Sequence, residues 1–86
     1  MPEISRFYGI VIGMYYDDHL PPHFHAVYAG MKAKVGINPV SLLDGRLPPR
    51  ALALVIEWTM LHQGELLENW KLRTTNQPLM KIEPLK

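Results

Sequence analysis

The chain has no cysteine among its 86 residues. A disulfide framework, a zinc site built from thiolates and a cysteine nucleophile are therefore excluded. Long apolar runs are also missing, because the run over residues 10–16 is much shorter than the roughly 20 residues that cross a bilayer. The same run lacks the basic flank and the small-residue cleavage site of a secretory signal. These absences predict a soluble cytoplasmic protein with no membrane association.

The chain also has almost no excess of charge of either sign. Nine Lys and Arg residues against eight Asp and Glu residues leave a net charge of +1, which gives no overall attraction for nucleic acid. Apolar residues are sufficient for a core, since Leu, Ile, Val and Phe make up 25 of the 86 residues. Chains with less than roughly 20 % of these residues tend to remain disordered. The composition therefore predicts one globular domain over residues 1–86.

The first half of the chain has the two-residue periodicity of β-strands. Residues 5–17 are predicted to form one long strand, since apolar residues recur at every second position. Residues 23–28 and 31–37 form the clearest hairpin, with Ala29 and Gly30 as a two-residue turn. An irregular connection with a short fourth strand follows.

This hairpin has one apolar and one polar face. A two-residue turn pairs Phe24 with Val35 and places His25 beside Lys34, so that alternate side chains share a face. The apolar face is predicted to consist of Phe24, Ala26, Tyr28, Met31, Ala33, Val35 and Ile37. The polar face carries histidine and lysine.

The second half of the chain is predicted to be helical. Pro48 and Pro49 suit a helix start, residues 50–62 are apolar almost all round, and residues 65–73 form a second helix. The tail over 79–85 is expected to be extended, as an edge strand. The predicted fold class is α+β, with an antiparallel meander of three to four strands and two helices packed on one face. Helix 50–62 has more apolar surface than one sheet covers, so a homodimer or a partner protein is expected to use it.

Residues 17–25 contain the candidate site, with three histidines and two aspartates in nine residues. His23 and His25 are two positions apart on a strand, so their rings share one face. If Tyr16 pairs with Phe24, Asp17 lies opposite His23 and Tyr15 lies opposite His25. Asp18 and His19 then belong to the adjacent loop.

One chemistry for this face is metal-independent proton transfer on a phosphodiester, as in a ribonuclease. His23 and His25 would exchange protons near neutral pH, while Asp17 orients His23. Nearby lysines would bind the phosphate and stabilise developing negative charge. The predicted substrate-binding residues are Lys32, Lys34 and Tyr15.

Two alternatives remain open. A divalent metal such as zinc would be held by nitrogen and oxygen ligands, although neighbouring lysines repel a cation. The ligands in that case are His19, His23, His25 and Asp17. The other alternative is a non-catalytic interaction module, in which helix 50–62 docks a partner and the histidines only shape the loop. A lone H-x-H pattern on a solvated strand is most often simple surface.

Three segments resemble a family of small bacterial and archaeal proteins of unknown function. They are Ile4–Ile10 (ISRFYGI), Met14–His19 (MYYDDH) and Pro21–Ala26 (PPHFHA). Members are often encoded beside another small protein, so the resemblance implies one component of a toxin–antitoxin-like pair. No cofactor and no catalytic residue follows from the resemblance. Together with the histidine and lysine face, it leads us to expect a small partner-dependent protein that binds or cleaves RNA or another phosphate-bearing ligand.

Overall fold

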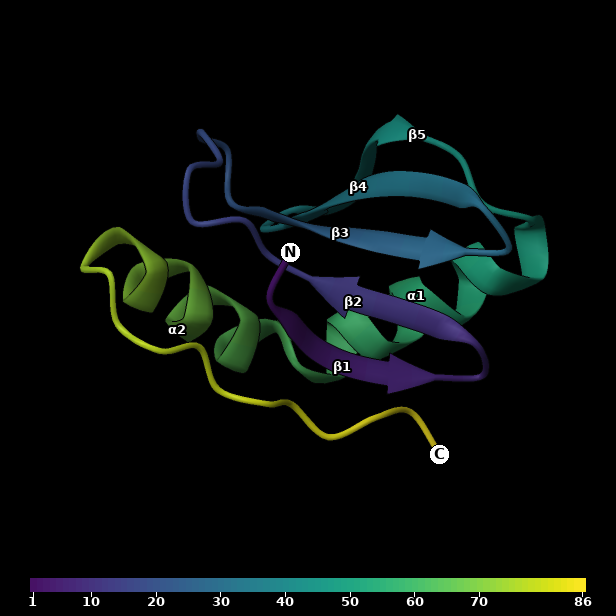
Figure 1. Ribbon diagram of the computed structural model, residues 1–86. Coiled ribbons are helices and arrows are strands. Elements are labelled where there is room, and N and C mark those ends of the chain that lie inside the picture. The colour runs from purple at the N-terminus through teal and green to yellow at the C-terminus, as the bar shows by residue number, and fades with distance from the viewer.

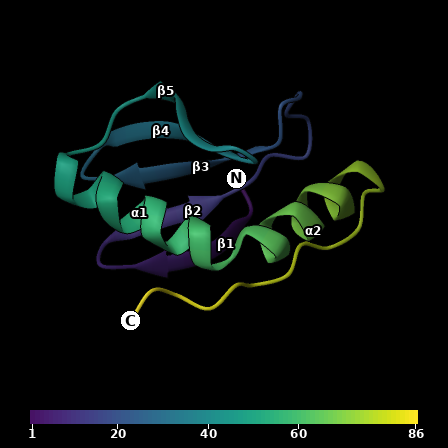
Figure 2. The same cartoon turned by 180° about the vertical axis from the view of Figure 1, so that it is seen from behind.

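The computed structural model describes residues 1–86. Five strands come first: β1 (Glu3–Phe7), β2 (Ile10–Gly13), β3 (His23–Tyr28), β4 (Met31–Ile37) and β5 (Val40–Gly45). The helices α1 (Pro49–Leu61) and α2 (Gln63–Thr74) follow. The strands form one antiparallel sheet in sequence order, with α1 across one face and α2 extending past the end of the sheet (Figures 1 and 2). The predicted α+β fold is confirmed, with one strand more than expected.

The prediction of a single strand over residues 5–17 is wrong. Tyr8 and Gly9 form a tight turn with φ of 51° and 80°, and this turn divides the segment into β1 and β2. Ala29 and Gly30, with φ of 50° and 80°, repeat this backbone in the predicted turn between β3 and β4. A turn with two positive φ values matches the twist of the paired strands. Phe7 pairs with Ile10, so the turn changes which positions face the core from odd to even numbers. Tyr8 lies within the turn, but as an apolar residue two positions before Ile10 it extends the alternation of β2 and hides the break.

The register of the β3–β4 hairpin is the predicted one. Phe24 pairs with Val35, and His25 pairs with Lys34. Side chains on β3 and β4 therefore alternate between the two faces as expected. β5 then pairs with β4 through a bulge at Lys34 and Val35, in the connection where a short fourth strand was predicted.

The register between β2 and β3 differs from the prediction by two residues. Ile12 pairs with Ala26 and Gly13 with His25, whereas the expected pairing joined Tyr16 to Phe24. A shift of two residues keeps every side chain on its predicted face. It nevertheless ends β2 at Gly13, so residues 14–22 form a loop and not the continuation of a strand.

The core lies between the sheet and α1. Trp58 of α1 is fully buried, with its ring 5.3 Å from that of Phe7 and 5.7 Å from that of Phe24. Its indole N–H donates a hydrogen bond to the Glu83 carbonyl at 2.8 Å. The buried residues of the sheet include Ile10, Ile12, Phe24, Ala26, Ala33, Val35 and Ile37. The predicted apolar face is therefore the one that packs on α1.

The helix bounds agree with the prediction within two residues. Neither helix has the length and apolar character needed to cross a membrane.

The tail is extended as predicted but is not a strand, because it joins the sheet through a single backbone hydrogen bond, from Ile82 N–H to the Ile4 carbonyl at 2.8 Å. The tail thus lies beside β1 and covers that edge of the sheet.

Candidate functional site

The loop over residues 14–22 is held in place by α2, β4 and the start of the tail. Arg73 of α2 donates from Nη1 to the Tyr16 carbonyl at 2.9 Å, and the Tyr16 hydroxyl donates to the Gln77 carbonyl at 2.7 Å. Ile37 N–H donates to the Pro22 carbonyl at 3.1 Å. Loop and helix lie side by side in both views of the molecule (Figures 1 and 2). These bonds fix the loop against the end of the sheet.

His23, the first residue of β3, lies where the loop, the sheet and α2 meet. Its ring centroid is 5.3 Å from that of Trp70, and the residue is only 5 % exposed. The guanidinium of Arg73 covers the Trp70 ring at 3.5 Å. The expectation that His23 lies on a solvated sheet face is therefore wrong, since α2 packs over that end of the sheet.

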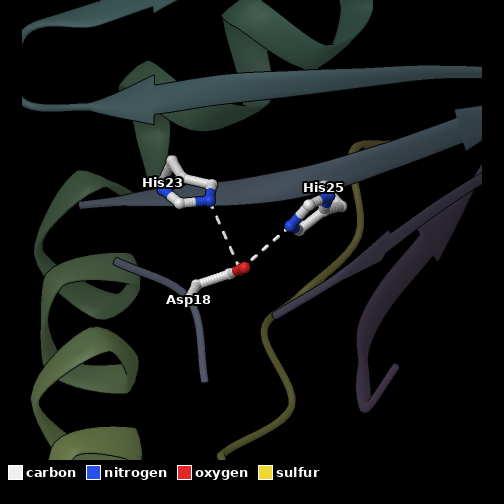
Figure 3. A group of neighbouring side chains, drawn as sticks. All are labelled: Asp18, His23 and His25. Atoms are coloured by element: carbon white, nitrogen blue, oxygen red, sulfur yellow. Dashed lines mark hydrogen bonds and ion pairs between the residues drawn. The ribbon is translucent and has the colours of Figure 1, made fainter. Parts of the chain in front are cut away.

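Asp18 joins the two histidines of β3. Its Oδ2 atom is 2.9 Å from Nε2 of His25 and 3.3 Å from Nε2 of His23 (Figure 3). The two imidazole rings are 5.3 Å apart, which confirms that they share a face. The Tyr15 ring meets the His25 ring edge-on at 4.6 Å. One carboxylate oxygen and two imidazole nitrogens thus converge on one point.

Hydrogen bonding defines the tautomer of His23. Its Nδ1 lies 2.8 Å from the Pro21 carbonyl, which can only accept, so Nδ1 carries the proton. In the neutral ring, Nε2 then presents a lone pair toward the Asp18 carboxylate. This nitrogen is buried and has no hydrogen-bond partner. His23 Nε2 and Asp18 Oδ2 are therefore two acceptors that face each other across 3.3 Å. A proton or a metal cation between them would stabilise this arrangement.

An open cavity of about 530 Å³ adjoins the cluster. Its lining residues are Asp17, Asp18, His19, Leu20, Pro21, His23, Lys34, Leu43 and Asp44. Three carboxylates therefore face the cavity with one ammonium group, and Asp44 is also the β5 residue that pairs with Lys34. Lys32 and Tyr15 border a separate hollow of about 280 Å³ beside His25.

The model of a family described as a domain of unknown function, DUF4160, matches residues 9–71. This match covers nearly three quarters of the chain. The chain belongs to the DUF4160 family. The resemblance to a family of unknown function is thereby confirmed. No curated protein and no solved structure matches the chain.

The region matched by the DUF4160 model contains Asp18, His23 and His25 and also Trp70, which covers His23. It ends before Arg73. The three residues of the cluster and the ring that shields one of them thus belong to the family domain.

The predicted position of Asp17 opposite His23 is wrong. Because β2 ends at Gly13, Asp17 lies in the loop, where it lines the cavity but makes no hydrogen bond or ion pair with a histidine. Its neighbour Asp18 makes both histidine contacts. His19 also lines the cavity and lies outside the cluster.

Sequence reasoning missed the roles of Trp70 and the Pro21 carbonyl in this site. The contact of Trp70 with His23 joins residues 47 positions apart, so no local pattern indicated it. Only the proximity of Asp18 to the histidines in the sequence pointed toward its role.

Proposed function

We propose that this DUF4160 protein binds a divalent transition metal ion through Asp18, His23 and His25. The observation that carries the proposal is the buried Nε2 atom of His23, which has no hydrogen-bond partner. Histidines that bind metals typically donate their other ring N–H to a backbone carbonyl or a carboxylate, which fixes the tautomer and aims the lone pair. The hydrogen bond from His23 Nδ1 to the Pro21 carbonyl has that role here.

The spacing of the donor atoms fits such an ion. Metal–ligand bonds of roughly 2.0–2.1 Å in a tetrahedral site put ligand atoms about 3.3 Å apart. The Asp18 oxygen is 3.3 Å from His23 Nε2 and 2.9 Å from His25 Nε2, and the three donors lie within 4.8 Å of one another. Two imidazoles and one carboxylate are a donor set used by zinc and by non-haem iron.

The charges of the cavity beside Asp18 and His23 favour a cation. The adjoining cavity has the carboxylates of Asp17, Asp18 and Asp44, and Lys34 is its one permanently charged basic residue. The objection that lysines repel a metal is weakened at Lys34, which pairs in register with Asp44. Lys32 lies outside this cavity and borders the hollow beside His25.

Three protein ligands leave a position for water or for a ligand atom, and a divalent ion there lowers the pKa of bound water and polarises oxygen ligands. The chain's own residues would do the rest. Pro21 and Trp70 hold His23 in one orientation, and Tyr15 holds His25. Lys34 and His19, at the cavity wall, are placed to contact an anionic group.

Metal titration of the purified protein tests the proposal. We expect one Zn²⁺ or Co²⁺ ion per chain by isothermal titration calorimetry, with visible absorption bands when Co²⁺ binds. Asp18→Asn and His25→Ala each remove one ligand and should weaken binding at least about tenfold, as loss of a ligand or its support typically does.

The chain offers matched controls for this experiment. Asp17→Asn and His19→Ala change the same residue types in the same loop, but they leave the three donor atoms in place. Their metal affinities should equal that of the wild type. A protein that binds no metal, or one in which Asp17→Asn is as damaging as Asp18→Asn, would contradict the proposal.

A second candidate function is the binding or cleavage of RNA or another phosphate ester without a metal. Lys34 favours it, because this lysine lines the same cavity as His23. Asp18 would take the orienting role first predicted for Asp17. Cleavage of RNA that persists in a chelator and disappears in His25→Ala would support this function and contradict the metal-dependent one. Membership of a toxin–antitoxin-like pair rests on the resemblance alone and remains a prediction.

A further inference from the structure

Helix α1 has a second apolar face that no other part of the chain covers. Its buried residues, Ala51, Val55, Trp58 and Thr59, pack toward the sheet. On the opposite side of the helix, residues that are mostly apolar recur every three or four positions and form a stripe. This spacing normally belongs to the face of a helix that packs against a core. We call this stripe the outer α1 face; it consists of Pro49, Leu52, Ala53, Ile56, Glu57, Met60 and Leu61.

Most of the outer α1 face is open to solvent, while Leu52 and Ile56 are half-buried. These seven residues surround a shallow hollow of about 750 Å³ to which only α1 contributes side chains. Met60 and Leu61 are each 66 % exposed, far more than the apolar residues on the other side of the helix. Contiguous apolar surface of this kind usually marks an interaction site. The interactions of the Asp18–His23–His25 cluster do not involve this face.

Two charged residues, Arg50 beside the stripe and Glu57 at its edge, indicate what covers it. Arg50 and Glu57 are seven positions apart, which is about two turns, so they lie on the same side of α1. Neither forms an ion pair or a side-chain hydrogen bond within the chain. They therefore provide one free positive and one free negative charge along a single edge of the apolar stripe.

We propose that a second copy of this chain packs its α1 antiparallel to the first across the outer α1 face. A two-fold axis between antiparallel helices brings the same edge of each helix together. Arg50 then lies beside Glu57 of the partner subunit, and the pair is repeated by symmetry. Ala53, near the middle of the stripe, leaves room for Ile56 of the partner subunit.

The self-complementary charges favour a second copy over an unrelated partner. A two-fold contact matches each patch with itself, so one Arg50 and one Glu57 on each chain form two ion pairs. Burial of Leu52, Ile56 and Met60 would supply most of the binding free energy, and the charges would fix the antiparallel orientation.

Sedimentation velocity of the full chain tests the oligomeric state. The wild type should sediment as a dimer of twice the 9.9 kDa chain mass. Ile56→Glu places a carboxylate in the middle of the stripe and should give a monomer with an unchanged far-UV circular dichroism spectrum. The matched control Leu42→Glu, at a 43 % exposed leucine of β5, should remain dimeric.

A charge exchange tests the orientation. Glu57→Arg should weaken the dimer on the order of tenfold, because both symmetric ion pairs become repulsive. The double variant Arg50→Glu/Glu57→Arg should restore wild-type dimerisation. A monomeric wild type, a dimer that survives Ile56→Glu, or a double variant as weak as Glu57→Arg would each overturn the proposal. A wild-type chain that uses the outer α1 face to bind a different small protein, and not a second copy of itself, would also overturn the proposal.

Discussion

A stack of side chains holds His23 in place at the scale of single residues. The ring lies against Trp70, and the Arg73 guanidinium lies over that indole at 3.5 Å. A cation over an aromatic face is attracted by the ring quadrupole, more strongly when the pair is removed from water. Arg73 also binds the Tyr16 carbonyl at 2.9 Å. Residues that cannot bind a metal themselves thus fix both His23 and the loop that supplies Asp18.

A separate residue pair makes stability depend on pH. The hydrogen bond from the Arg6 guanidinium lowers the pKa of Glu3 below its usual 4.5, and the same contact raises the pKa of Arg6. A carboxyl with a depressed pKa in the folded state stabilises the fold above its unfolded pKa, and this contribution is lost as pH falls through the folded value. Glu3→Gln should therefore lower the melting temperature slightly at neutral pH and not at all near pH 2.

Melting curves of the wild type and Glu3→Gln at the two pH values measure this effect. Glu68→Gln is the control, because Glu68 is exposed and has no ion pair or side-chain hydrogen bond. An equal difference between wild type and Glu3→Gln at both pH values would contradict the assignment to the Glu3–Arg6 pair.

Which of Asp17 and Asp18 contacts the histidines could not be predicted from the local sequence. Strand alternation was sufficient to place His23 and His25 on one face, because that property is local. Which of two adjacent aspartates turns toward them depends on the path of the loop. That path is set by Arg73, more than fifty positions away, so nothing near the aspartates in the sequence distinguished them.

At the scale of elements, α2 determines where the tail lies. Asn69 is fully buried, and its side chain makes a pair of hydrogen bonds with Met80. Asn69 Nδ2 donates to the Met80 carbonyl and Met80 N–H donates to Oδ1, each at 2.9 Å. The tail then reaches β1, where Ile82 N–H donates to the Ile4 carbonyl. One side chain of α2 thereby sets the course of the segment that covers a sheet edge.

Asn69→Ala should release this segment. The substitution leaves both backbone groups of Met80 without their partner, which costs on the order of 1–3 kcal/mol of unfolding free energy. Hydrogen exchange at the Ile82 amide should accelerate more than exchange in β3. Urea unfolding and amide exchange by NMR measure the two effects. Gln77→Ala, an exposed side chain at the start of the tail, is the control, and an equal loss in both variants would count against Asn69.

Elements with local signals were predicted and those with distant partners were not. The β3–β4 hairpin has alternation on both sides of a two-residue turn, so its register follows directly. A nine-residue loop separates β2 from β3, and the predicted register of this pair was wrong by two residues. The Tyr8–Gly9 turn was missed because Tyr8 extends the alternation of β2, and neither this turn nor that at Ala29–Gly30 has the Asn-Gly or Asp-Gly sequence that usually identifies such turns.

For the molecule as a whole, the candidate metal site lies where three segments meet. Asp18 belongs to the loop and His23 and His25 to the sheet (Figure 3). Trp70, which contacts His23, belongs to α2. Only the folded chain brings these groups together. An ion that binds the native arrangement and not the unfolded chain must stabilise the native state.

Metal binding should therefore raise the melting temperature. Free metal at 100 times its dissociation constant adds about 2.7 kcal/mol, which for a chain of this size is a shift on the order of 10 °C or more. Thermal unfolding followed by circular dichroism with and without Zn²⁺ measures the shift, and excess chelator should reverse it. Asp17→Asn should keep the full shift, whereas Asp18→Asn should lose about half of it or more, because a site that is tenfold weaker adds only about 1.4 kcal/mol at the same metal concentration. A shift of equal size in both variants would assign the stabilisation to Zn²⁺ bound elsewhere, and the absence of any shift in the wild type would exclude a native metal site.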